Sequence, residues 1–124
     1  MDEFRVLDDH ELGEAAGTPG LTRRVAFEGD DHWFGHVEAD PDTMSGWHHD
    51  GDTITLGYVL AGQITIEHGP GGSRSMRVGP GGFFTVPAGA IHREGNAKNE
   101  AAEVILTRVG EGPPVFPAEK PKPA

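Results

Sequence analysis

The residues of this chain that could bind a metal ion are concentrated in one short segment. His48, His49 and Asp50 follow one another directly. In an extended strand, side chains two positions apart lie on the same face, so His48 and Asp50 point together while His49 points away. A third ligand must come from a neighbouring strand. His92 is the candidate, because it follows a Pro-Ala-Gly turn that directs it back across the sheet.

Two imidazoles and one carboxylate leave open positions on a first-row metal ion. Non-haem Fe(II) is the favoured metal for this set, and Zn, Ni, Co and Mn also fit it. Open positions admit a substrate, water or dioxygen, which predicts a catalytic site. If the strand is bulged, His49 is the alternative ligand. In the opposite alternative, Asp50 points to solvent and no metal binds.

Two residues are candidates for moving protons at this site, Tyr58 and His36. The position of His36 in its strand leaves open whether it faces the core or the pocket. Aromatic and apolar side chains from strands that approach the site are expected to line a substrate pocket: Phe34, Met44, Tyr58 and Phe84. Each of them could instead be plain core, because such side chains fill barrel interiors.

The elements that must position these residues are short β-strands. Apolar residues alternate with a period of two, and Ile54, Leu56, Tyr58 and Leu60 share one face. Glycine and proline, 19 and 10 of 124 residues, supply the turns between them. Strands are predicted over residues 23–27, 33–39, 53–60, 63–68, 75–78, 83–86 and 103–109. Short strands at this spacing indicate an all-β sandwich or barrel.

Two segments also match a known pair of motifs. The pattern G-x5-P-x-G-x2-H-x3-N is met at every defined position by Gly81, Pro87, Gly89, His92 and Asn96. The pattern that precedes it is met in part, with His48 and Asp50 in two histidine positions and Thr55 in a glutamate position. In these motifs the chain resembles the small single-domain cupins. The resemblance implies an all-β, cupin-type jelly-roll β-barrel with a metal ion in its mouth.

The departures from the motif bear on function. Thr55 removes one of the four usual ligands of the family, and Asp50 changes the ligand set toward harder metals. The favoured function is a metal-dependent enzyme, an oxygenase or other oxidoreductase, that acts on a small organic molecule in the barrel. One alternative uses the metal as a Lewis acid for isomerisation, cyclisation or dehydration. The other is a non-catalytic cupin that binds a small ligand, which the missing glutamate supports.

Composition limits the partners of the chain. A formal net charge of −10 argues against binding to nucleic acid or to an anionic membrane surface. The absence of cysteine excludes disulfides and thiolate ligands. Without a visible signal or spanning segment, a cytoplasmic location is expected. Exposed sheet edges predict a homodimer.

The expected organisation is an acidic leader over 1–20, the cupin barrel over 21–110 and a proline-rich tail over 111–124, with short disordered termini.

Overall fold

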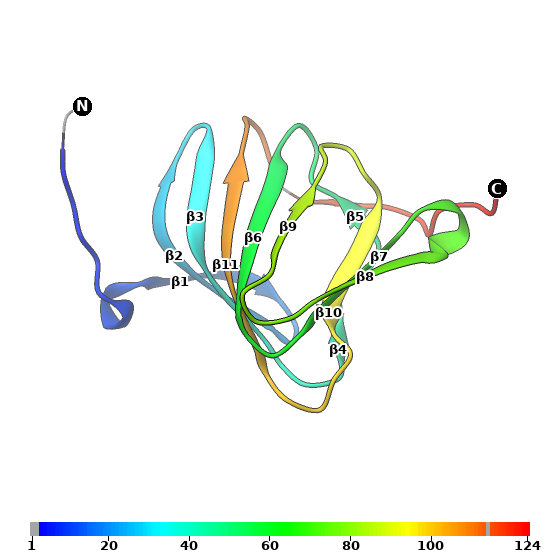
Figure 1. The fold of residues 1–124 in the computed structure, drawn as a ribbon. Coiled ribbons are helices and arrows are strands. Elements are labelled where there is room, and N and C mark those ends of the chain that lie inside the picture. The colour runs from blue at the N-terminus through cyan, green and yellow to red at the C-terminus, as the bar shows by residue number, and fades with distance from the viewer. Residues whose placement is uncertain (1–2, 114) are drawn as a thin grey trace.

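The computed structural model describes residues 3–113 and 115–124, which form two antiparallel β-sheets facing each other (Figure 1). The first sheet has the order β1-β2-β3-β11-β6-β9, with β1 Gly13–Thr18, β2 Leu21–Gly29, β3 His32–Ala39, β11 Ala102–Val109, β6 Ile54–Ala61 and β9 Phe83–Val86. The second has the order β12-β5-β10-β7-β8, with β12 Phe116–Pro117, β5 His48–His49, β10 His92–Asn96, β7 Ile64–His68 and β8 Arg74–Val78, while β4 (Thr43–Met44) also pairs with β10. Within the described residues, only two 3-10 turns are helical, η1 (Asp9–Glu11) and η2 (Pro70–Gly72). The predicted all-β jelly roll is confirmed.

The hydrophobic core lies between the two sheets. Val37, Val59 and Val104 face inward from three adjacent strands of the first sheet, and Ile66 faces them from β7 of the second. The alternation of buried and exposed positions along β11 follows the period of two that the sequence shows. This core fixes which face of every strand points toward the interior, and therefore which polar side chains can reach a site there.

The facing of β6 is the opposite of what the apolar pattern suggests. Ile54 and Leu56 are 41% and 43% exposed, and they lie on the outer face of the first sheet. The inner face of β6 carries Thr55, Gly57 and Val59, which are buried. A side chain at Gly57 would overlap the ring of Phe84, which fills that part of the interior. The larger apolar residues of β6 are therefore directed outward.

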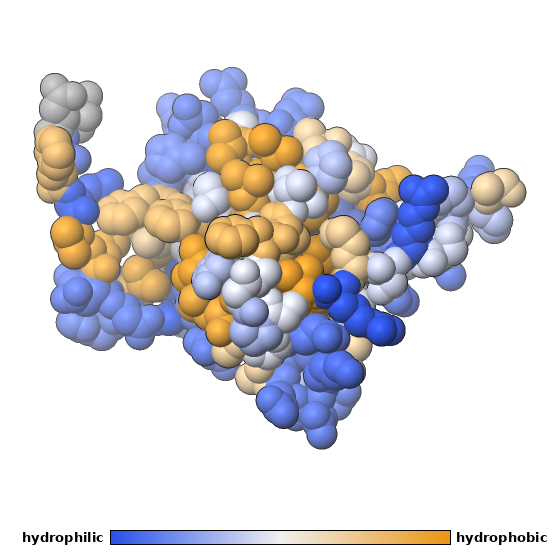
Figure 2. Space-filling model, viewed as in Figure 1, coloured by the Kyte–Doolittle hydropathy of each residue, from blue (hydrophilic) through white to orange (hydrophobic). Residues whose placement is uncertain are grey.

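An apolar patch covers the outer face of the first sheet, over β3, β11, β6 and β9 (Figure 2). Its exposed members are Phe34, Ile54, Leu56, Leu60, Phe83 and Val109. Phe83 is the most exposed of them, at 79%, and it packs against Tyr58 with ring centroids 4.6 Å apart. No helix in the described part of the chain combines the length and the hydropathy that a membrane span requires.

Both terminal segments add strands to the sheets, although disorder was expected there. In the predicted leader, β1 pairs with β2, and the guanidinium of Arg24 binds Asp9 at 2.8 Å. In the predicted tail, β12 pairs with β5 through Phe116 and His49, and the amide of Ala118 donates to the carbonyl of Trp47. Backbone hydrogen bonds to a neighbouring strand order these segments, and composition alone does not show them.

Candidate metal centre

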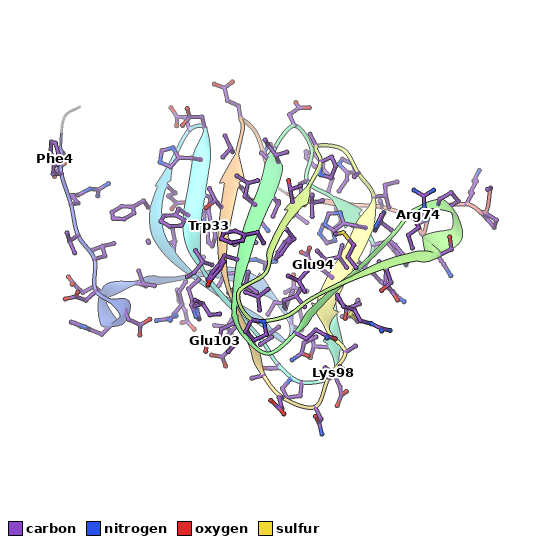
Figure 3. The ribbon with its side chains drawn as sticks, in the orientation of Figure 1. Phe4, Trp33, Arg74, Glu94, Lys98 and Glu103 are labelled. Atoms are coloured by element: carbon purple, nitrogen blue, oxygen red, sulfur yellow. The ribbon has the colours of Figure 1, made fainter. Side chains whose placement is uncertain are left out.

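Two strands of the second sheet carry the central residues of the site. His48 in β5 and His92 in β10 are direct cross-strand partners, which brings their rings to a centroid distance of 4.4 Å. Glu94 stands two positions after His92 and therefore shares its face of β10. Figure 3 shows Glu94 in the space between the two sheets.

Three side chains converge at this point: the ligand atoms of His48, His92 and Glu94 lie within 4.8 Å of one another. Glu94 Oε1 is 3.6 Å from His48 Nε2, and Glu94 Oε2 is 3.2 Å from His92 Nε2. The carboxylate of Asp50 also approaches both rings, at 3.7 Å from His48 Nε2 and 4.0 Å from His92 Nε2. The structure thus places the three predicted ligands together and adds Glu94, which the sequence analysis missed. The spacing rule that linked His48 to Asp50 also links His92 to Glu94.

Backbone carbonyls fix the orientation of both imidazoles. His48 Nδ1 donates to the carbonyl of Gly46 at 2.9 Å, and His92 Nδ1 donates to the carbonyl of Ala90 at 2.8 Å. A carbonyl oxygen can only accept, so each Nδ1 carries the proton and, in the neutral ring, Nε2 has a free lone pair. Outer hydrogen bonds of this kind hold metal-binding histidines in position.

Asp50 is held in the interior by two threonines. Thr55 Oγ1 donates to Asp50 Oδ2 at 2.7 Å, and Thr53 Oγ1 donates to the Asp50 carbonyl at 2.7 Å. Asp50 is only 2% exposed, so the alternative in which it points to solvent is wrong. Thr55, at the position of the family's glutamate, therefore orients a carboxylate that belongs to another residue.

The charges of the cluster depend on one another. Burial lowers the pKa of His48 and of His92, but the adjacent carboxylate of Glu94 outweighs this effect and raises both pKa values above the ordinary one. Burial alone would raise the pKa of Glu94, whereas the two adjacent histidines hold it far below the usual range. Glu94 is consequently an ionised carboxylate at neutral pH, as a metal ligand must be.

The donor set fits a divalent metal ion. His92 Nε2 and Asp50 Oδ1 are buried and have no hydrogen-bond partner among residues 3–113 and 115–124. Buried polar atoms are normally paired. Nitrogen and oxygen ligands at about 2.0–2.2 Å from one ion lie roughly 3–4 Å apart, which is the spacing of the atoms here. An ion bound by His48, His92 and Glu94 would satisfy His92 Nε2, with the carboxylate of Asp50 beside it.

The structure places the alternative ligand and two pocket candidates as follows. The ring of His49 points away from the cluster and stacks on Phe116 at 5.0 Å, while its Nδ1 accepts from the amide of Gly51. Phe84 packs against the core and lines an internal cavity that Glu94 also lines. Met44 is half-buried in β4, opposite Gly95, and does not line that cavity.

Three other predictions for the site are wrong because the residues lie on the outer face of the first sheet. Tyr58 and His36 both stand beside Ile105 in register, on the face opposite the core valines. His36 is buried there between Arg24 and Glu103, with its Nε2 at 3.1 Å from Glu103. Phe34 is 41% exposed. None of these three side chains can reach the metal centre.

Comparisons with known proteins agree with this description. Residues 35–108 match the cupin domain family. No curated protein matches the sequence. The polyketide cyclase RemF from Streptomyces resistomycificus has a TM-score of 0.76 and 21% identity, over 96% of this chain and 90% of RemF. KdgF from Halomonas sp. has a TM-score of 0.70 and 20% identity, over 86% of this chain and 94% of KdgF.

A protein with a double-stranded β-helix domain from Klebsiella pneumoniae has a TM-score of 0.74 and 18% identity, over 95% of this chain and all of that one. At these identities the three structures establish the fold alone. The family match covers more than half of the chain and includes His48, Asp50, His92 and Glu94. The chain belongs to the cupin domain family.

Proposed function

We propose that this protein is a mononuclear metal-dependent enzyme that acts on a small organic molecule inside the barrel. The observation that carries the proposal is the convergence of His48, His92 and Glu94 within 4.8 Å, with Asp50 beside them. A divalent metal held by these residues would polarise a bound molecule or bind dioxygen at its open positions. The protein's part is to orient the ligands and to exclude bulk water from the interior.

An oxygenase or other oxidoreductase reaction is the first candidate. Two imidazoles and a carboxylate with open positions are the ligand set of non-haem Fe(II) oxygenases. The set of His48, His92 and Glu94 fulfils that requirement without Asp50. We expect Fe(II), with Zn, Ni, Co or Mn as other metals that suit the same donors.

A redox-neutral reaction, such as a cyclisation, isomerisation or dehydration, is the second candidate. A second carboxylate, Asp50, makes the set harder and leaves fewer open positions if it binds the metal. One of the similar structures, RemF, is named a polyketide cyclase. With Tyr58 and His36 on the outer face, Asp50 and Glu94 are the carboxylates that could accept a proton at the centre.

Metal content tests the proposal directly. We expect the purified full chain to bind one equivalent of Fe(II) or Zn(II), measured by elemental analysis and by calorimetry under anaerobic conditions. His48→Ala, His92→Ala and Glu94→Gln remove ligands, so each should weaken metal binding by more than the roughly 100-fold that is typical of outer-shell changes. His32→Ala is the matched control, since this histidine is exposed and pairs with the exposed Asp31.

Wild-type protein that binds no metal would contradict the proposal. A second measurement, on the metal-loaded protein, distinguishes the oxygenase from the redox-neutral reaction. Nitric oxide added to the Fe(II) form gives an electron paramagnetic resonance signal when the metal has a position open to dioxygen. Such a signal supports the oxygenase, whereas its absence together with tight Zn(II) binding supports the redox-neutral reaction.

A further inference from the structure

Two arginines lie inside the barrel, near the metal centre. Arg23 comes from β2 and Arg108 comes from β11, and both line the internal cavity to which Glu94 contributes. The other lining side chains are apolar, mostly aliphatic, with Phe84 as the aromatic one. The cavity therefore has two positive groups and one carboxylate, that of Glu94, in walls that are otherwise hydrocarbon, and it adjoins the candidate metal ligands through Glu94.

The polar atoms of these arginines are poorly paired. The Nε atoms of Arg23 and Arg108 are buried without a hydrogen-bond partner in the described part of the chain. Arg23 makes one long hydrogen bond, 3.5 Å from Nη1 to Thr18 Oγ1, and Arg108 lies over the ring of Trp33 at 5.7 Å. Neither guanidinium has a carboxylate oxygen within 4.0 Å among the described residues. The arginines that form ion pairs in this part of the chain are Arg24 and Arg93.

The charges of the interior act on each other. Burial lowers the pKa of Arg23 and the positive charge of Arg108 lowers it further, while Glu94 and Asp50 oppose both effects. Arg108 is 6% exposed. Arg23 is half-buried, and the Nε atoms of both arginines are buried without a partner among the described residues. Two such like charges are unfavourable unless an anion pairs with them. The arrangement is thus complementary to a negatively charged ligand.

Each arginine adjoins the metal centre from a different strand. Arg23 also lines a second cavity, which His48 lines as well. Arg108 is the cross-strand partner of Thr55, the residue whose hydroxyl holds Asp50. A molecule bound to both guanidiniums would consequently lie beside the cluster of His48, His92 and Glu94.

We propose that Arg23 and Arg108 bind the carboxylate of a small organic acid and so orient the substrate toward the metal centre. A guanidinium offers parallel N–H donors whose spacing matches the two oxygens of a carboxylate, and such charge-assisted hydrogen bonds are strong. The aliphatic walls suit a short hydrocarbon portion. This inference rests on the proposed function, because it names the substrate class of the same site.

The test uses glycolate as a probe, with its neutral amide, glycolamide, as the matched control ligand. Dissociation constants come from amide chemical-shift titrations of the metal-free full chain and then of the Zn(II)-loaded chain. We expect glycolate to bind the metal-free protein and glycolamide to bind at least about tenfold more weakly. Arg23→Gln and Arg108→Gln should each weaken glycolate binding about tenfold or more, because a hydrogen bond to a charged group is worth about 1.5–3 kcal/mol. Arg77→Gln, on the exposed face of β8, should change nothing.

Three outcomes would overturn the inference. These are equal affinity for glycolate and glycolamide, glycolate binding that survives both arginine substitutions, or tighter binding of inorganic phosphate than of glycolate. His92→Ala separates this inference from the proposed function, since His92 lines neither cavity: the variant should weaken Zn(II) binding more than about 100-fold and leave metal-free glycolate binding intact. If the glutamine variants do not fold, Arg23→Lys and Arg108→Lys keep the charge but lose the planar fork. They should weaken glycolate binding about threefold or more, and unchanged affinity in both would also overturn the inference.

Discussion

Thr55 shows how a single hydroxyl can position a carboxylate of the candidate metal centre. Its Oγ1 donates to Asp50 Oδ2 at 2.7 Å, and both residues are buried. Removing the hydroxyl would leave Oδ2 without its donor in the interior. Such an unsatisfied buried acceptor is expected to destabilise a protein by about 1–3 kcal/mol.

We predict that Thr55→Val lowers the free energy of unfolding by this amount and weakens metal binding about 10- to 100-fold, as is typical when an outer hydrogen bond to a ligand is lost. Urea denaturation and metal calorimetry measure the two effects. Thr85→Val, at an exposed position of β9, is the control and should be close to neutral. Unchanged metal affinity in Thr55→Val would show that Asp50 does not belong to the ligand set.

At the residue scale, the sequence identified part of the centre because ligand types and strand spacing are local properties. His48 and Asp50 follow from the period of two, and Glu94 could have been found by applying the same rule to His92. The role of Arg23 and Arg108 was harder to predict from the sequence, since a lone arginine in a strand usually lies in solvent. Only the pairing of β2 and β11 with β3 shows that both face the interior.

At the element scale, β4 depends on the absence of a side chain in β10. A Cβ atom at Gly95 would overlap the carbonyl oxygen of Thr43, and Gly95 pairs directly with Met44. The close approach of β4 also places Ser45, whose Oγ accepts from the amide of Glu94 at 3.0 Å. A larger residue at position 95 would separate the strands and disturb the backbone that carries Glu94.

We therefore predict that Gly95→Ala destabilises the protein by about 1–3 kcal/mol through overpacking. Metal affinity should also fall, because Glu94 is the adjacent residue. Gly79→Ala is the matched control: a Cβ atom there would have no neighbour within 4 Å. Thermal denaturation of both variants checks the prediction, and equal melting temperatures would contradict it.

The strands themselves were largely predictable, whereas the direction that they face was not. Alternation located β2, β3, β6, β7, β8, β9 and β11 to within a few residues. It did not show which side of β6 faces the core, because hydrophobicity alone favoured Leu56 and Tyr58. Only a glycine fits at position 57, since the ring of Phe84 from β9 occupies the space that a side chain there would need. Packing between strands that are distant in sequence decides this, and no local pattern contains it.

At the scale of the whole molecule, the chain is strongly acidic, whereas its interior holds charges of both signs. The chain has a formal net charge of −10, yet two of its ten Lys and Arg residues lie in the barrel beside the carboxylates of the metal centre. Two copies of such a chain repel each other over most of their surface. The patch formed by Phe34, Ile54, Leu56, Leu60, Phe83 and Val109 has no charged member.

This uncharged patch is where a second copy can pack without like-charge repulsion. The expected homodimer is accordingly assigned to the outer face of the first sheet, since the same apolar surface on two copies is self-complementary. Phe83, at 79% exposed, lies in this face and would bury the most apolar surface on association. We predict that the wild-type protein has twice the mass of the chain in light scattering.

Phe83→Glu should convert that dimer to monomers, because association would then bury two carboxylates in an apolar contact. Ser75→Glu adds the same charge at an exposed position of β8, in the second sheet, and should leave the dimer intact. Metal binding should be unchanged in both variants, since neither position adjoins the cluster of His48, His92 and Glu94. A monomeric wild type would contradict the homodimer, and a dimeric Phe83→Glu variant would move the interface to another face, with the exposed edge strands β8 and β1 as the next surfaces to test.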